Sequence, residues 1–389
     1  MTAAAIVLTG CAAPARQSAL DSAALAGIDN AIEATVARHG MPGAQFYLAS
    51  ADTVFERAYG ALGYAEGAAP VTASTIYDVA SLTKVLATAP SVLLLVEAGK
   101  LDLDAPLARY VPGCAGRGRD ALTLRHLLTH SSGFPAGLPA VPPWQGRDAA
   151  LALACGKDIT DAPGTAFRYS DINYILLGLV VEQASGLTLD AFAERHLFAP
   201  LRMTHTGFLP LGRFAAATIA PTHLSPALTA DKALHPDLAH GELLQGVVHD
   251  PTARRMGGVA GSAGLFSTAA DVARFARLLQ GGGEVDGVRV LSRESVRLMS
   301  TVQSPPGLAQ RTIGMDIDSP FARPRGTLFP VGSFGHTGYT GCFLWMDPGS
   351  ASLYIFLSNR VYPDDKANIL PLYGELGTLA AKAVGVPEH

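Results

Sequence analysis

Stretches typical of β-strands lie at both ends of this chain, whereas stretches typical of α-helices fill its middle. Two strand-like stretches lie near the N-terminus and three near the C-terminus: AQFYLAS (44–50), VFERAYG (54–60), GSFGHTGYTG (332–341), CFLWMD (342–347) and SLYIFLSNR (352–360). Short runs rich in aromatic and β-branched residues, bounded by turn residues, favour strands. The order of elements therefore predicts an α+β fold, in which both chain ends build one mixed domain and a helical domain is inserted between them.

This order also gives expected boundaries. Residues 25–80 and 255–389 would form the α/β domain, and residues 81–254 the inserted, mainly helical domain. Residues 1–24 would be a signal and tether. The stretch 205–250 has no regular pattern, and long irregular segments of this kind often shape a functional site.

Two of the expected helices contain features that bear on the site. The first leads from Ser81 towards Gly99 and contains Pro90, which should bend it. The second, INYILLGLVVEQASG (172–186), is strongly apolar and has Gly186 at its C-terminal end, where glycine commonly stops a helix.

The composition is that of a globular protein with a sizeable core. Hydrophobic residues make up 49% of the chain and charged residues only 16%, with a net charge of −4. No block rich in Lys and Arg occurs, so the sequence lacks the basic footprint of a nucleic-acid-binding protein. The longest obvious apolar run, VLLLV (92–96), is far shorter than the roughly 20 residues of a membrane span.

The N-terminus contains a candidate lipid anchor. The stretch LTGC (8–11) resembles a bacterial lipoprotein signal, in which Cys11 would be the lipidated residue. No Lys or Arg precedes the short apolar segment, so an alanine-rich tail is the alternative. The lipoprotein interpretation predicts a periplasmic protein whose membrane attachment, if any, is through this lipid.

The other cysteines and a pair of histidines give no metal pattern. Cys114, Cys155 and Cys342 are odd in number and show no CxxC spacing, so we expect small core residues and no disulfide framework. The stretch HLLTH (126–130) lacks the glutamate of the HExxH zinc motif. We therefore expect no metal.

A serine and a lysine three residues apart form the first candidate site, within YDVASLTKVLAT (77–88). Lys84 is one of only six lysines, against 23 arginines, and it lies among apolar residues. Residues three apart share a helix face, so Ser81 and Lys84 would point the same way. Desolvation would lower the pKa of the lysine and make it a base for the serine. The alternative is a helix-capping serine and a lysine whose amine reaches solvent.

Two further motifs follow in order: Y-S-D (169–171) before a helix and H-T-G (336–338) in a strand. With them the chain resembles the serine β-lactamase and penicillin-binding protein superfamily, especially its class C, D-peptidase and family VIII esterase branch. The resemblance covers roughly residues 25–385. It includes the stretches EAGKLDLDAPLARYVP, LTLRHLLTHSSGFP and GGVAGSAGLFSTAADVARFARLL.

The resemblance implies a role for each matching residue. Ser81 would be the acylated nucleophile, Lys84 would keep it ionisable, and Tyr169 would be the general base that later acts as the acid. The backbone N–H groups of Ser81 and Tyr339 would form the oxyanion hole, and Gly338 would leave room for the substrate backbone. The implied fold is an antiparallel sheet flanked by helices with an inserted all-helical domain, and no cofactor is implied.

Two departures from the family pattern bear on the substrate. Position 171 is Asp where many relatives have Asn, and an ionised Asp cannot donate a hydrogen bond to a substrate carbonyl. Position 336 is His where β-lactamases and many peptidases have Lys, and histidine is mostly neutral at pH 7. We therefore expect acyl-enzyme hydrolysis of a carboxylic ester or D-amino-acid amide, with weak β-lactam hydrolysis.

The alternatives are a class C-like β-lactamase and a non-catalytic sensor or wall-binding lipoprotein. The partner in every case would be a small-molecule ester, a peptide or a β-lactam.

Two other stretches contain candidate site residues that carry less weight. The stretch AGSAG (260–264) resembles a nucleophile elbow but lacks a preceding strand, so Ser262 is expected in a glycine-rich loop near the site. Two interpretations are open for His249 and Asp250: an approach to the site from the irregular segment or, as we expect, a loop turn before Pro251.

Overall fold

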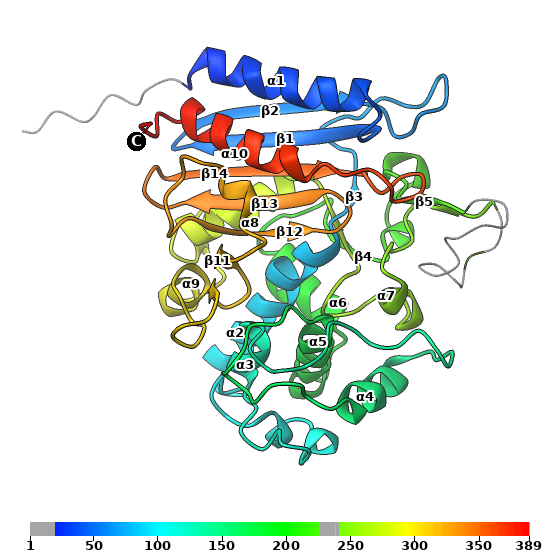
Figure 1. Ribbon diagram of the computed structural model, residues 1–389, viewed down its shortest axis with the longest axis vertical. Helices are drawn as coiled ribbons and strands as arrows, with labels where there is room; N and C mark the ends of the chain where they lie inside the picture. The colour runs from blue at the N-terminus through cyan, green and yellow to red at the C-terminus, as the bar shows by residue number, and fades with distance from the viewer. Residues whose placement is uncertain (1–19, 226–237, 239–240, 389) are drawn as a thin grey trace, which may run out of the picture.

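Strands from both ends of the chain meet in one antiparallel sheet. The computed structural model describes residues 20–225, 238 and 241–388, so Cys11 lies outside the described residues. The sheet has seven strands in the order β10-β11-β12-β13-β14-β1-β2 (Figure 1). Their bounds are β1 Gly43–Ser50, β2 Thr53–Gly60, β10 Gln310–Arg311, β11 Asp316–Asp318, β12 Phe334–Gly338, β13 Cys342–Asp347 and β14 Ser352–Ser358. The C-terminal strand β14 pairs with the N-terminal strand β1 along its whole length, from Ala44–Ser358 to Ser50–Ser352.

Helices lie on both faces of this sheet and below it in Figure 1. They are α1 Ser22–Ala37, α2 Ala89–Glu97, α3 Leu124–Leu128, α4 Arg147–Gly156, α5 Asp171–Ser185, α6 Leu189–Ala193, α7 Pro251–Arg255, α8 Ala269–Gln280, α9 Arg293–Ser300 and α10 Leu370–Ala383. Short strands pair in three smaller sheets: β3 Tyr77–Asp78 with β7 Leu265–Ser267 and β4 Gly207–Phe208, β5 His223–Leu224 with β6 Leu243–Leu244, and β8 Glu284–Val285 with β9 Val288–Arg289.

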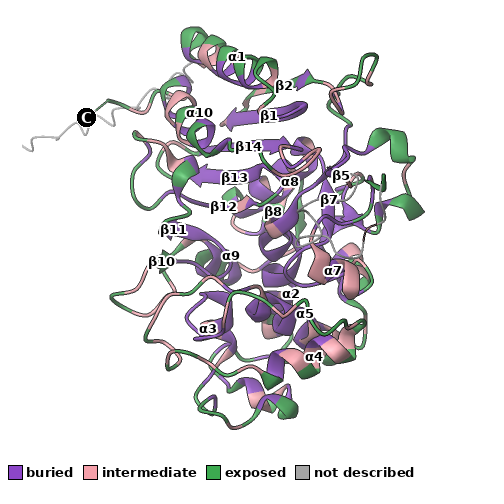
Figure 2. Cartoon of the chain, turned by 45° about the vertical axis from the view of Figure 1, so that its right-hand side comes forward, coloured by how far each residue is buried: buried purple, intermediate pink, exposed green. Residues whose placement is uncertain are grey.

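The central strands are buried on both faces, as Figure 2 shows. Every residue of β13 and β14 is buried. Alternate side chains point to opposite faces of a strand. Phe343 and Phe356 accordingly pack in one cluster with α1 and α10, while Leu344 and Ile355 pack in the larger cluster that includes α2, α5 and α8. This two-sided burial explains why these strands appear in the sequence as continuous apolar runs.

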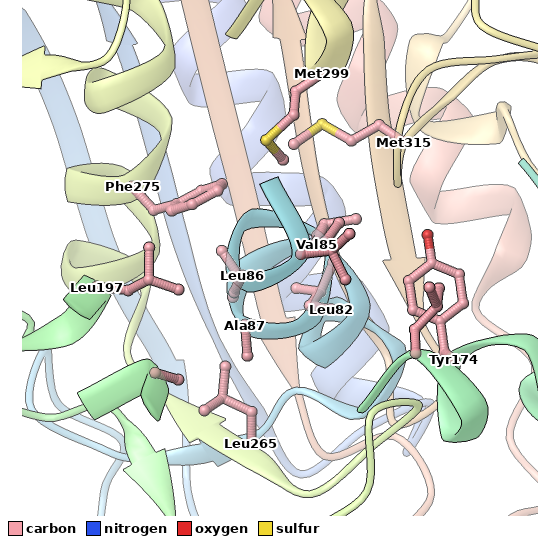
Figure 3. Packing of buried hydrophobic residues seen from close by; sticks show 14 of the residues in the cluster. Leu82, Val85, Leu86, Ala87, Tyr174, Leu197, Leu265, Phe275, Met299 and Met315 are labelled. Atoms are coloured by element: carbon pink, nitrogen blue, oxygen red, sulfur yellow. The ribbon is translucent and has the colours of Figure 1, made fainter. Parts of the chain in front are cut away.

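The helical segment that carries Ser81 and Lys84 lies at the centre of the larger core. Figure 3 shows Leu82, Val85 and Leu86 packed among side chains from several other elements. The segment Ala80–Glu97 is long and apolar enough to cross a membrane, but 78% of it is buried inside the fold, as in the core helix of a globular protein. A π-helical turn, Lys84–Thr88, comes directly before α2, and Pro90 lies in the first turn of α2.

One expectation about the cysteines is wrong. Cys114 and Cys155 form a disulfide with a Cα–Cα distance of 4.6 Å, which joins a short 3-10 turn to α4. Only Cys342 is a free buried thiol among the described residues. The odd number of cysteines had pointed away from a bridge, but an odd set leaves one residue over without preventing the other two from pairing.

Candidate active site

A strained turn presents Ser81. Ala80, directly before it, has φ of +47°, a conformation that costs a residue with a side chain about 1 kcal/mol or more. The buried Asp78 carboxylate holds this turn, because its Oδ1 accepts a hydrogen bond from Ala80 N at 2.8 Å and its Oδ2 accepts one from His249 N at 2.7 Å. Desolvation raises the pKa of Asp78 to about 6, although both hydrogen bonds act in the opposite direction.

Lys84 lies beneath Ser81 and is fully buried. Its Nζ donates to Ser81 Oγ at 3.0 Å and to the carbonyl oxygen of Ser262 at 2.8 Å, and lies 2.7 Å from Asp171 Oδ1. Burial lowers the pKa of Lys84, but the Asp171 carboxylate and Tyr169 raise it more strongly, so the pKa lies above its ordinary value. The expectation of a lowered lysine pKa is therefore wrong: Lys84 is an ammonium group, held by a partner 87 positions away in the sequence.

Tyr169 lies in the segment directly before α5, and its ring is close to the Lys84 amine. Lys84 Nζ lies 5.3 Å from the centre of its ring, which stacks on the His130 ring with centroids 4.3 Å apart. His130 is buried, and its Nδ1 accepts a hydrogen bond from Ser170 N at 3.1 Å. Burial lowers the pKa of His130 well below its ordinary range, with help from the charges of Arg311 and Lys84. His130 is thus a neutral platform for Tyr169.

Strand β12 carries the H-T-G motif and brings it close to the turn that carries Ser81. His336 is buried, and its Nδ1 lies 2.7 Å from the carbonyl oxygen of Thr337. Burial lowers the pKa of His336 well below its ordinary value, and the charges of Arg311 and Lys84 add to this effect. Position 336 therefore provides a neutral imidazole in place of a fixed cation.

The end of β12 lies directly against the turn that carries Ser81. A Cβ atom on Gly338 would be 2.5 Å from the carbonyl oxygen of Val79, so no side chain fits there. Thr340 Oγ1 donates to the carbonyl oxygen of Asp78 at 2.6 Å and ties the next turn to the same segment. Glycine at position 338 is therefore needed for a structural purpose as well as for the expected one of leaving room for the substrate backbone. Without a side chain, it lets β12 approach the turn that carries Ser81.

Tyr339 is held by residues that the motifs did not indicate. Arg360 Nη2 donates to its carbonyl oxygen at 2.6 Å, and the Arg360 guanidinium lies 4.8 Å from the centre of its ring. The Tyr339 hydroxyl donates to Asp365, whose other oxygen is 2.7 Å from Arg360 Nη1. The ring of His249 also stacks on Tyr339 at 6.0 Å. These contacts hold the side chain and the carbonyl group of the residue whose N–H is the expected oxyanion donor.

A cavity of about 440 Å³ connects these groups. Its lining includes Ser81, Tyr169, His336, Gly338 and Tyr339 and continues past Phe321 to the start of α10. The charged residues that line it are paired: Asp316 with Arg311 at 3.4 Å, Arg360 with Asp365, and Lys366 with Asp364. The cavity thus gathers the expected nucleophile, oxyanion donors and acid–base groups around balanced charges.

The loop before α7 contacts the site through His249, which was the alternative to the simple turn that we expected there. Asp250 caps α7, accepting a hydrogen bond from Ala253 N at 2.6 Å. Desolvation and the nearby Asp171 carboxylate raise the pKa of Asp250 to about 6. No motif indicated Asp78 or Arg360, because the site groups that they hold, His249 N and the Tyr339 carbonyl oxygen, are distant from them in the chain.

The remaining candidates have structural roles. Ser262 lies in the expected glycine-rich loop and contributes its backbone carbonyl, not its hydroxyl, to the site. His126 caps α3 through Nδ1, which accepts from Thr123 N at 3.2 Å. Among residues 20–225, 238 and 241–388, no group of three or more His, Cys, Asp or Glu side chains is arranged to hold a metal ion.

Sequence comparison identifies relatives over most of the chain. The family model described as Beta-lactamase matches residues 28–377. An Escherichia coli K12 protein named "Putative D-alanyl-D-alanine carboxypeptidase" is 35% identical over 332 residues, which cover 79% of this chain and 75% of that protein. A Salmonella typhi protein of the same name is 32% identical over 335 residues, covering 81% of this chain and 76% of that protein.

Solved structures share the fold. A penicillin-binding protein homologue from Caulobacter crescentus superposes with a TM-score of 0.71 at 20% identity, covering 94% of this chain and 99% of its own. EstCE1, a hydrolase with promiscuous acyltransferase activity, also gives 0.71 at 20% identity, covering 92% and 98%. The predicted α+β fold and superfamily are confirmed, and the chain belongs to the β-lactamase family of serine hydrolases.

Proposed function

We propose that this hydrolase cleaves a carboxylic ester or a D-amino-acid amide through an acyl-enzyme on Ser81. The observation that carries the proposal is the 3.0 Å hydrogen bond from the buried Lys84 Nζ to Ser81 Oγ, at the wall of the 440 Å³ cavity. A nucleophile within hydrogen-bond distance of an amine, which a third group orients in turn, is the arrangement that activates serine.

The reaction follows from the positions of these groups. Ser81 Oγ attacks the substrate carbonyl, and the backbone N–H groups of Ser81 and Tyr339 stabilise the oxyanion. Each such donor typically contributes roughly 3 kcal/mol to transition-state stabilisation. Tyr169, next to Lys84 and stacked on His130, takes the proton from Ser81 Oγ as the new bond to the carbonyl carbon forms, and gives it to the leaving group as that group departs. Water then attacks the acyl-enzyme by the same steps in reverse, which releases the acid and restores Ser81.

The charges of the cavity support an uncharged ester over a β-lactam. A β-lactam or a peptide ending in D-alanine has a carboxylate, which a fixed cation would bind. Here position 336 is a neutral imidazole, and Arg360 and Lys366 already pair with Asp365 and Asp364. Burying a second carboxylate beside these pairs would cost free energy unless a hydrogen bond or charge compensates.

A D-alanyl-D-alanine carboxypeptidase is the second candidate. The name of the Escherichia coli relative, at 35% identity, favours it. The kinetic test compares kcat/KM for p-nitrophenyl acetate and butyrate, a peptide ending in D-Ala-D-Ala, and nitrocefin. The proposal predicts ester hydrolysis at least about tenfold more efficient than nitrocefin hydrolysis; a kcat/KM for nitrocefin that exceeds both other classes would favour a class C-like β-lactamase.

A non-catalytic sensor is distinguished from both enzymes by labelling. A fluorophosphonate probe reacts with an activated serine, so the wild-type chain should be labelled and Ser81→Ala should not. Absence of labelling in the folded wild-type chain would favour a sensor or wall-binding protein.

We also propose that the protein works in the bacterial periplasm and that a lipid on Cys11 can tether it. The Cys114–Cys155 disulfide supports an oxidising compartment, since such bonds are rare in the reducing cytosol. Fractionation after expression in a bacterium tests the anchor: Cys11→Ala should move the protein from the membrane to the soluble fraction. Unchanged partitioning would contradict lipidation.

A further inference from the structure

Tyr169 lies in an irregular segment whose position depends on one histidine. Residues 166–170 form neither a helix nor a strand, so regular secondary structure does not hold this part of the backbone. The residues on both sides of Tyr169 bond instead to His130. Arg168 N donates to the carbonyl oxygen of His130 at 2.9 Å, and Ser170 N donates to its Nδ1 at 3.1 Å. His130 thus holds the chain directly before and directly after the tyrosine.

The imidazole of His130 also fixes the direction of the Tyr169 ring. The two rings stack with centroids 4.3 Å apart and an angle of 27° between their planes. The rings of Phe321 and His336 lie farther from the tyrosine, at centroid distances of 5.1 and 6.0 Å. Aromatic pairs of this kind typically contribute about 0.5–1.5 kcal/mol beyond their buried area. His130 is the nearest of these three rings, and it also bonds the backbone beside Tyr169.

Hydrogen bonds fix the tautomer and the orientation of His130. A backbone N–H can only donate, so Nδ1 is the acceptor and the neutral imidazole has its proton on Nε2. Asn173 Nδ2 lies 3.1 Å from the same Nδ1. Ser132 Oγ donates to Asn173 Oδ1 at 2.6 Å, so the amino group of this amide faces the imidazole. Helix α5, which contains Asn173, thereby holds the histidine ring against Tyr169.

Two features of His130 lower stability. Its φ of +56° lies in the left-handed region, which costs a residue with a side chain roughly 1–2 kcal/mol. Its buried Nε2 has no hydrogen-bond partner among the described residues, and an unpaired buried donor costs about 1–3 kcal/mol. Backbone strain and unpaired polar groups of this kind are typical of functional sites. Stability alone therefore does not explain a histidine at this position.

We propose that His130 is a positioning residue, which holds the Tyr169 phenol between Ser81 and the leaving group. The proposal rests on the proposed function, in which Tyr169 takes the proton of Ser81 and gives it to the leaving group. Proton transfer needs heavy atoms about 2.6–3.2 Å apart, so a small displacement of the phenol would slow both transfers. His130 itself exchanges no proton and acts through Tyr169.

The test compares kcat/KM for two acetyl esters that differ in their leaving group. Both esters form the same acyl-enzyme, and kcat/KM includes only the steps up to its formation. p-Nitrophenol leaves readily as an anion, whereas phenol, which ionises at about pH 10 as tyrosine does, depends more on the proton from Tyr169. In His130→Ala, kcat/KM should fall about tenfold for p-nitrophenyl acetate and at least about 100-fold for phenyl acetate, the lower end of the usual contribution of general acid–base catalysis. A loss of folded protein alone would lower both by the same factor.

A second variant keeps the test valid if His130→Ala does not fold. In His130→Asn, asparagine tolerates the left-handed backbone, and its side-chain oxygen can still accept a hydrogen bond from Ser170 N. It should show the same larger loss for phenyl acetate, to a smaller extent than His130→Ala. The matched control is His126→Ala, which removes an imidazole that caps α3. This control should keep the wild-type ratio of kcat/KM for the two esters.

A double-mutant cycle with Tyr169→Phe shows whether His130 acts through Tyr169. Tyr169→Phe removes the phenol hydroxyl, so adding His130→Ala should lower kcat/KM for p-nitrophenyl acetate no further. Equal losses for the two esters in both His130 variants, or a His130→Ala loss that adds in full to that of Tyr169→Phe, would overturn the proposal. Wild-type kcat/KM for both esters in Tyr169→Phe, or full activity of Ser81→Ala, would refute the proposed function instead.

Discussion

The carbonyl oxygen of Val79 occupies the space that a side chain on Gly338 would need, with only 2.5 Å between that oxygen and the position of a Cβ. This contact joins β12 to the turn that presents Ser81. It sets the spacing between the two backbone N–H groups of the proposed oxyanion hole, one on each of these segments.

Gly338→Ala should therefore impair catalysis more than stability. The added methyl group must push β12 away from Val79 and separate the two N–H donors. We expect kcat for ester hydrolysis to fall by about 10²–10³-fold, as when one oxyanion donor is removed. The steady-state rate and the melting temperature check this together; an enzyme with normal kcat would show that the close approach is not required.

The Cys114–Cys155 disulfide should contribute strongly to stability. It closes a loop with a sequence separation of 41 residues, for which the chain-entropy model gives about 4 kcal/mol. The double variant Cys114→Ser, Cys155→Ser should lose about this free energy of unfolding in a urea titration. Reducing agent should destabilise the wild type equally and leave the double variant unchanged; equal stability of the two proteins would contradict the bridge.

Asp78 should make the folded state less stable as the pH rises. Its pKa is raised to about 6 in the folded chain, so the folded state binds its proton more tightly than the unfolded state. Its contribution to the free energy of unfolding is therefore full below about pH 4 and is lost as the pH rises towards 6 and above. The loss is on the order of 3 kcal/mol for a shift of about two pKa units.

Comparison with Asp78→Asn isolates this effect. The free energy of unfolding of the wild type minus that of the variant should fall between about pH 4 and pH 7, measured by urea unfolding at each pH. A constant difference would mean that Asp78 titrates normally.

His336→Lys should improve reaction with β-lactams. The substitution places a cation at the cavity wall, where a substrate carboxylate would otherwise meet a neutral imidazole. We expect the second-order rate constant for acylation by benzylpenicillin to rise about tenfold, equivalent to ~1.4 kcal/mol. His336→Gln is the neutral control. An equal rise in both variants would show that size, not charge, limits the reaction.

The sequence predicted the elements whose signal is local. The helix expected at 172–186 is observed as Asp171–Ser185, with Gly186 in the left-handed conformation that ends it. The strand stretches near both termini lie within one sheet. The continuous apolar pattern of β13 and β14 reflects burial on both faces, whereas β2 is largely exposed. Ser81, Lys84, Tyr169, His336 and Gly338 come together around one cavity region, as their order along the chain suggested.

The features that could not be predicted from the sequence depend on contacts between residues that are far apart in the chain. The direction of the Lys84 pKa shift was wrong because burial alone was considered; burial is the largest single effect, but Asp171 and Tyr169 together raise the pKa more than burial lowers it. The Cys114–Cys155 bridge was missed because pairing depends on where α4 packs. Asp78 and Asp250 resemble ordinary turn residues until the fold places them beside the site, Asp78 buried and Asp250 partly buried.

The central claim is that Ser81 is acylated. Intact-protein mass spectrometry after rapid mixing with an activated ester, with Ser81→Ala alongside, measures this directly. The account predicts an increase by the mass of one acyl group in the wild type, located on the peptide containing Ser81, and none in Ser81→Ala. An adduct of equal yield in Ser81→Ala, or turnover of the ester by that variant at the wild-type rate, would contradict it.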